Sequence, residues 1–179
     1  MEYATKNLEN DHVSILKLIE VMEKMTTMIP VIEDLDEVVD LIRDFADGLH
    51  HAKEESLLFP LMAERGFSMT QGPIAVMLSD HVQGRNYVKG MAVNIDRLKN
   101  GDRSATQAIY ENMLGYGELL TNHISKENNI LFRMADNALY PEDHYSLLMQ
   151  FGEIESQVKT TNLKGDYLAR IEKLTEKYL

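Results

Sequence analysis

The residue types that could do chemistry in this 179-residue chain are six histidines and the glutamates spaced regularly from them. The His-x-x-x-Glu spacing occurs three times, at His50/Glu54, His51/Glu55 and His123/Glu127. Residues four apart lie on one face of a helix, so each pair can act on the same ligand. Imidazole nitrogen together with carboxylate oxygen suits iron, manganese or zinc. The spacing therefore indicates a metal site.

The helices that must position these pairs are indicated by composition. Long stretches rich in Leu, Met, Glu, Lys and Ala favour helix, and no stretch shows the alternation expected of a strand. Four prolines and ten glycines cluster in a few places and mark the boundaries. The predicted helices cover about residues 7–28, 34–65, 72–100 and 102–138, then a shorter helix from 141 and a last one over 166–178, with Lys164 and Gly165 between these two.

Four long helices with short connections predict an all-α fold, an up-down-up-down four-helix bundle. One or two extra C-terminal helices would pack across the bundle or cap one end. No linker of low-complexity composition interrupts the chain. We therefore expect a single domain over residues 1–179, with the bundle at about 7–138 and the accessory helices at about 141–178.

One histidine falls near the middle of each bundle helix, in the series His12, His50, His81 and His123. In an antiparallel hairpin, residues equidistant from the turn lie at the same height, because both helices rise by about 1.5 Å per residue. The midpoints between consecutive members of the series fall next to the predicted turns at Pro30, Gly66 and Gly101. The four imidazoles are therefore expected to converge at one level.

Glu54 and Glu127 lie one turn beyond their histidines on two helices that run in the same direction, so both carboxylates reach the same end of that level. Two carboxylates flanked by four imidazoles form a site for two metal ions with the carboxylates bridging. Without metal, the bundle would bury two charges and several polar groups at a cost of several kcal/mol. A metal-free helical interaction module is disfavoured for that reason.

The overlapping pairs His50/Glu54 and His51/Glu55 cannot both face the interior of a regular α-helix, because adjacent residues differ by about 100°. An internal repeat favours the first pair. Residues 50–59 align without gaps on residues 123–132 through the shared pattern His-x-x-Lys-Glu-x-x-(Leu/Ile)-Leu-Phe. His51 and Glu55 are then neighbours of the site, although apolar residues also give the His51 face some buried character.

Four segments in order carry a family resemblance: LENDHVSIL, HHAKEESLLFPLM, GPIAVMLSDH and NHISKENNILF, within about residues 8–135. They resemble the hemerythrin-like family, the HHE cation-binding domain, and most of all the hemerythrin domain of di-iron proteins that repair iron–sulfur clusters after nitrosative stress. The cysteine-bearing N-terminal domain of those proteins has no counterpart in this sequence. The resemblance implies a non-heme di-iron centre of two iron ions, with terminal ligands His12, His50, His81 and His123 and bridging ligands Glu54 and Glu127.

The sequence departs from the oxygen-carrying hemerythrins on the third helix. Those proteins have two histidines four residues apart there, whereas the residue four before His81 is Met77. Each metal is left with about four protein donors, so solvent, an oxo or hydroxo bridge or another side chain must complete its coordination. Glu9, one turn before His12, and Tyr116, two turns before His123, are further candidate ligands outside the predicted set. His144, on the accessory helix, is expected at the surface.

Asp11 and Asp80 directly precede His12 and His81. A carboxylate can orient a ligating histidine by accepting a hydrogen bond from its other ring nitrogen. At an adjacent position, however, a solvated charge is the favoured interpretation.

Composition excludes several other classes of function. Zero cysteines exclude disulfides, thiolate-bound zinc or iron–sulfur clusters and a cysteine nucleophile. A net charge of −11 makes nucleic acid and anionic membranes poor partners. No stretch approaches about eighteen consecutive apolar residues, and the N-terminus lacks the pattern of a signal peptide. We therefore expect a cytoplasmic protein, of an oligomeric state that the sequence does not define.

The leading hypothesis is a protein that binds or senses O₂ or NO, reacts with peroxide, or handles iron under redox stress. Open coordination positions favour such reactivity over reversible oxygen carriage. An oxidase or peroxidase of ferritin or rubrerythrin type is an alternative, but those bundles use Glu-x-x-His on two helices and this chain has one, at Glu9/His12. A second alternative is a redox-inert zinc or manganese site that only stabilises the fold. Whether the protein is an enzyme does not follow from the sequence.

Overall fold

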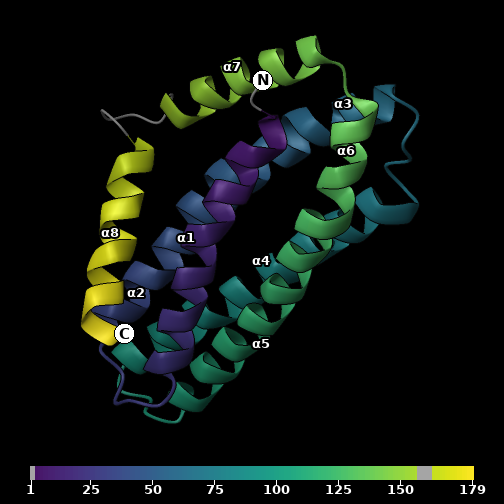
Figure 1. The fold of residues 1–179 in the computed structure, drawn as a ribbon. Coiled ribbons are helices and arrows are strands. Elements are labelled where there is room, and N and C mark those ends of the chain that lie inside the picture. Colours follow the sequence, from purple (N-terminus) through teal and green to yellow (C-terminus); the bar gives the residue numbers. More distant parts are fainter. Residues whose placement is uncertain (1–2, 157–162) are drawn as a thin grey trace.

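The computed structural model describes residues 3–156 and 163–179, and these are helical without any strand (Figure 1). The first bundle helix is α1 (Ala4–Met25) and the third is α4 (Gly72–Lys99). The second and fourth are composite. The second runs through α2 (Ile32–Leu41), the π-helical segments Ile42–His51 and Glu54–Leu58, and α3 (Phe59–Glu64). The fourth runs through α5 (Ala105–Lys126), the π-helical segment Glu127–Leu131 and α6 (Phe132–Ala138). Two further helices follow, α7 (Pro141–Ser156) and α8 (Leu163–Tyr178).

This arrangement confirms the predicted all-α class and the helical bundle with extra C-terminal helices. The turns lie at the predicted glycines, since Gly66 and Gly101 have φ angles of 94° and 92°, a left-handed conformation that favours glycine. One predicted boundary is wrong. Lys164 and Gly165 lie inside α8 instead of before it, and Lys164 is held there by ion pairs to Asp11 at 2.7 Å and Glu155 at 2.9 Å. The junction between α7 and α8 falls within residues 157–162, outside the described residues.

The two accessory helices cover different parts of the bundle (Figure 1). Helix α8, drawn in yellow, lies along α1 and α2, and the Arg170 guanidinium on α8 binds the Glu37 carboxylate on α2 at 2.7 Å. Helix α7 crosses the end of the bundle at which α1 begins. There the ring of His144 packs edge-on against Tyr3, with centroids 4.8 Å apart. The accessory helices thus close one side and one end of the bundle.

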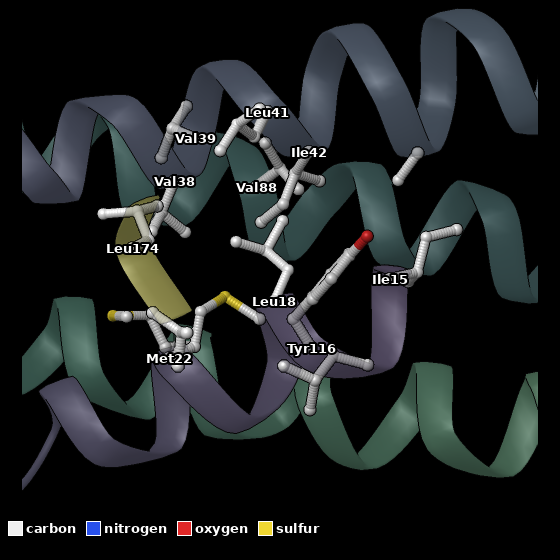
Figure 2. Close-up of a cluster of buried hydrophobic side chains, with 14 of the residues drawn as sticks. Ile15, Leu18, Met22, Val38, Val39, Leu41, Ile42, Val88, Tyr116 and Leu174 are labelled. Carbon is white, nitrogen blue, oxygen red and sulfur yellow. The ribbon is translucent and has the colours of Figure 1, made fainter. Parts of the chain in front are cut away.

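A layer of buried polar side chains divides the apolar core into two clusters. The larger cluster includes Ile15, Leu18 and Val88, part of which Figure 2 shows. The smaller cluster, near α7, includes Leu8 and Phe132. On each bundle helix, a histidine of the predicted series lies between residues of the two clusters along the sequence. The histidines therefore lie in the interior, with apolar packing above and below them.

Candidate metal centre

The composite helices change their hydrogen-bond pattern at the predicted ligands. The π-helical segments Glu54–Leu58 and Glu127–Leu131 begin at the two equivalent glutamates of the internal repeat. A π-helix bonds each residue to the fifth one along, is rare, and occurs mostly at functional sites. The repeat in the sequence is therefore also a repeat in backbone geometry.

The four histidines of the series meet in two pairs, and all four are buried. The Nε2 atoms of His12 and His50 are 3.0 Å apart, and those of His81 and His123 are 3.2 Å apart. Two nitrogens that bind one ion at about 2.1 Å, at right angles to each other, lie about 3 Å apart. Each pair therefore has the spacing of two ligands of one metal ion.

Glu54 and Glu127 lie between the two histidine pairs. One oxygen of Glu54 is 3.5 Å from Nε2 of His50, and the other is 3.4 Å from Nε2 of His81. The Oε2 atom of Glu127 is 3.2 Å from Nε2 of both His12 and His123. Each carboxylate thus contacts one histidine of each pair, as a carboxylate that bridges two ions must.

The donor set fits two metal ions. Glu54 and Glu127 are 0% exposed, yet none of their four carboxylate oxygens accepts a hydrogen bond. Buried carboxylates without such partners are strongly unfavourable unless a cation neutralises them. Two sets of four ligand atoms each lie within 4.8 Å of one another: His12, His50, Glu54 and Glu127, and His51, Glu54, His81 and His123.

The second set contains His51, and the prediction that only one of His50 and His51 can face the interior is wrong. The two residues are 1% and 4% exposed. Both belong to the π-helical segment Ile42–His51, whose wider turn separates consecutive side chains by roughly 80° instead of about 100°. The ring of His51 stacks on that of His81 with centroids 3.8 Å apart, and its Nε2 atom has no hydrogen-bond partner. In the sequence, the His51/Glu55 spacing and the apolar residues on the same helix face were the signals of this fifth imidazole.

Two aspartates lie against the outer nitrogens of two of these histidines. The Oδ2 atom of Asp11 is 3.5 Å from Nδ1 of His50, and that of Asp80 is 3.3 Å from Nδ1 of His123. Each aspartate contacts the histidine on the other helix of its hairpin, not its neighbour in the sequence. The interpretation of Asp11 as a solvated charge is wrong, because its side chain is 1% exposed.

The remaining two histidines of the series have hydrogen-bond partners in equivalent positions. His12 Nδ1 lies 2.7 Å from the amide oxygen of Asn128, and His81 Nδ1 lies 2.7 Å from a carboxylate oxygen of Glu55. Asn128 and Glu55 each directly follow one of the central glutamates. An Nδ1–H that donates outward leaves the Nε2 lone pair directed at the cluster. The polar surroundings therefore hold the imidazoles in the orientation that metal binding would require.

The last three residues singled out in the sequence are Glu9, Tyr116 and His144, and none of them belongs to the two sets of ligand atoms. Glu9 pairs with Arg133 at the surface. Tyr116 is buried, and its hydroxyl has no hydrogen-bond partner. The expectation that His144 lies at the surface is wrong, because α7 packs over the start of α1. His144 is 1% exposed and its Nδ1 accepts a hydrogen bond from the amide of Ala4 at 3.2 Å.

The geometry agrees with a family assignment. Residues 3–135 match the family model described as the Hemerythrin HHE cation binding domain. The chain belongs to the hemerythrin HHE cation-binding family. No helix in the described part of this HHE chain is long and apolar enough to cross a bilayer.

Curated relatives of this HHE chain carry the name iron-sulfur cluster repair protein YtfE. The protein from Escherichia coli O157:H7 is 33% identical over 88 residues, which cover 48% of this chain and 40% of that protein. Those from Escherichia coli K12 / DH10B and Shigella boydii serotype 18 are 32% identical over 88 residues. The chain thus matches less than half the length of these relatives. No solved structure matches it.

The buried glutamates of the HHE site control the protonation of the histidines. Burial opposes a charge on His12, but the neighbouring Glu127 and Glu54 outweigh it and raise the pKa of His12. Burial likewise opposes a charge on His81, but the adjacent carboxylates of Glu54 and Glu55 outweigh it and raise its pKa to about 9. Protons on these rings therefore compete with a metal ion for the same nitrogen atoms.

His51 behaves in the opposite way. Burial, together with the positive charge on the adjacent His81 ring, lowers the pKa of His51 to about 4. The ring is therefore neutral near pH 7, which is the form of imidazole that binds a metal.

Proposed function

We propose that this protein is a non-heme di-iron protein. Its terminal ligands are His12, His50, His81 and His123, and its bridging ligands are Glu54 and Glu127. The observation that carries the proposal is the placement of each glutamate between the two histidine pairs, fully buried and without a hydrogen-bond donor. Nitrogen and oxygen donors without any thiolate suit iron, with zinc or manganese as alternatives.

We further propose His51 as a protein ligand at the position formed by His81 and His123. A ring nitrogen of His51 lies within 4.8 Å of ligand atoms of those two histidines and Glu54, and its Nε2 atom has no hydrogen-bond partner. The hydrogen bond between its Nδ1 atom and Asp47 at 3.1 Å would hold the ring in that orientation. With His51 included, the two positions differ, since the one formed by His12 and His50 has fewer protein donors.

The proposed role is to bind or sense O₂ or NO, to react with peroxide, or to handle iron under redox stress. When bound, two irons supply a place for such a ligand and the electrons to reduce it. The protein's side chains would hold the ions in the interior of the bundle, because the five histidines, Glu54 and Glu127 are 4% exposed or less. The repair of iron–sulfur clusters by the named relatives supports a role connected with iron.

The test uses the full chain loaded with ferrous iron without oxygen and mixed separately with O₂, NO and peroxide. We expect an absorbance change on mixing with at least one of them. Zinc-loaded protein is the control and should show no change, because zinc has no accessible redox step. Iron-loaded protein that responds to none of the three would contradict the proposed role. Preferential retention of zinc or manganese would favour the redox-inert alternative.

A further inference from the structure

A cavity of about 170 Å³ opens to solvent beside the metal centre, between the π-helical segment Ile42–His51, α4 and α5. Its wall includes the rings of His51 and His81, so it reaches the second metal position. A single water needs about 10–15 Å³ on the same measure. The cavity is therefore much larger than O₂ or NO requires, and it has room for a ligand of several heavy atoms.

An unpartnered hydrogen-bond donor lies in the cavity wall. Tyr116 is 2% exposed and lines the cavity, and its hydroxyl has no hydrogen-bond partner. In Figure 2, the Tyr116 side chain carries an oxygen atom, and the other labelled side chains are apolar. Burial, and then the charge of Asp47, raise the pKa of Tyr116, so the hydroxyl keeps its proton. A buried O–H without an acceptor is unfavourable, which indicates that a ligand atom or a water belongs there.

The charged residues around the cavity are mainly basic. Arg43, Arg85 and Lys89 line it together with the carboxylate of Asp47. Arg85 pairs with Asp47 and with Glu55, each at 2.7 Å, so the excess of positive charge comes from Arg43 and Lys89. This local excess of positive charge occurs in a chain with a net charge of −11. Such a cavity concentrates anions while the rest of the surface repels them.

We propose that this cavity binds a small oxyanion beside the second metal position, with the Tyr116 hydroxyl donating a hydrogen bond to it and Arg43 and Lys89 attracting it at the mouth. The oxyanion is a short carboxylate or an inorganic ion of similar size. The inference rests on the proposed function, because the metal at His51 and His81 would lie next to the bound anion.

The test measures the dissociation constants of acetate and of nitrite by calorimetric titration of the full, metal-loaded chain. Tyr116→Phe removes the hydroxyl but keeps the ring, so it should fold normally and weaken anion binding about tenfold or more. Arg43→Gln and Lys89→Gln should each weaken binding several-fold, and less so at high salt. Lys17→Gln is the matched control, because Lys17 is half-exposed on α1 outside the cavity and pairs with Glu172.

A second variant narrows the cavity without removing a polar group. A Cβ atom added at Gly84 would meet the Tyr116 ring at 3.5 Å and Leu120 at 3.6 Å, which are ordinary contacts. Gly84→Ala should therefore fold and weaken the binding of acetate more than that of nitrite, because acetate has the additional methyl group. Binding of NO, which is uncharged and smaller, should not change in the Arg43 and Lys89 variants.

The outcomes separate this inference from the proposed function. Metal content is measured first on every sample, and protein without bound metal contradicts the proposed function itself. In metal-loaded protein, an anion affinity that Tyr116→Phe and the two mouth variants leave unchanged would overturn the cavity proposal. If neither acetate nor nitrite binds, the cavity proposal is overturned as well, and water is left as the partner of the Tyr116 hydroxyl. Binding of one anion and not the other identifies the carboxylate or the inorganic ion as the ligand class.

Discussion

The carboxylate of Asp11 lies 3.5 Å from Nδ1 of His50, on the side of the ring that faces away from the metal centre. Two lysines neutralise this buried carboxylate. Lys53 Nζ donates to one oxygen at 2.8 Å, and Lys164 Nζ, from α8, lies 2.7 Å from the other. The accessory helices therefore contribute directly to the surroundings of a proposed metal ligand.

The second half of the bundle repeats the arrangement closer to solvent. Lys126 Nζ donates to Asp80 at 2.6 Å, and Asp80 lies against His123. The Lys126 side chain is 40% exposed, whereas that of Lys53 is 0% exposed. The chain thus offers a buried and an exposed version of one interaction, which makes matched variants possible.

Lys53→Met should destabilise the protein far more than Lys126→Met. Loss of one partner from a buried ion pair costs about 3–5 kcal/mol when the other charge is left unpaired. The cost of losing Lys53 should approach the lower end of this range, because Lys164 still pairs with Asp11 at 2.7 Å. Loss of an exposed pair costs about 0–1 kcal/mol. The free energy of unfolding in urea measures the difference. Equal effects of the two variants would contradict the account of the buried pair.

Asp80→Asn should weaken metal retention with little loss of fold stability. A neutral amide polarises the His123 ring less than a carboxylate does, and loss of such an orienting group typically lowers metal affinity about 10–100-fold. Competition with a chelator measures the affinity. Asp96→Asn, on the exposed face of the same helix, is the control and should behave like the unmodified chain. Similar metal release from both variants would refute the orienting role of Asp80.

Gly48→Ala should destabilise the protein although glycine is a poor helix former. A Cβ atom at position 48 would lie 3.0 Å from the backbone oxygen of Arg43, within the π-helical segment that positions His50 and His51. In an ordinary helix, the same replacement stabilises by about 0.5–1 kcal/mol. Gly84→Ala, where the added atom has only ordinary contacts, should show that gain. A stabilised Gly48→Ala would indicate that the segment relaxes readily towards an α-helix.

His144 should make the stability depend on pH outside the metal centre. Burial lowers the pKa of this ring, so in mildly acidic solution the unfolded chain binds a proton that the folded chain does not. The free energy of unfolding therefore falls as the pH falls below about 6.5. In His144→Gln, the decrease between about pH 7 and about pH 5 should be smaller than in the unmodified chain. Urea unfolding at both pH values gives the difference, and parallel slopes for the two chains would contradict it.

The level of the histidine series could be predicted because it depends on two local regularities. Helix rise is constant, and the turns at Gly66 and Gly101 are marked by residues that suit a left-handed backbone. Equal distances from a turn then become equal heights in the bundle. The structure accordingly brings His12, His50, His81 and His123 to one level, together with Glu54 and Glu127.

The remaining features depend on relationships that a residue pattern does not contain. The inward position of His51 follows from a π-helical backbone, whereas the rotation of about 100° per residue in an α-helix would turn it away from the side of His50. The contact of Asp11 with His50 joins two helices, so the position of Asp11 next to His12 in the sequence did not indicate it. The burial of His144 depends on where α7 crosses the bundle.

The most direct test of the central claim is the metal content of the full chain purified from iron-replete cells, compared with Glu54→Gln and Glu127→Gln. We predict about two irons per unmodified chain, and a clear loss of iron from both variants, because each glutamate contacts both histidine pairs. An unmodified chain that contains no bound metal, or Glu54→Gln and Glu127→Gln variants that keep their iron, would contradict the bridged two-metal centre.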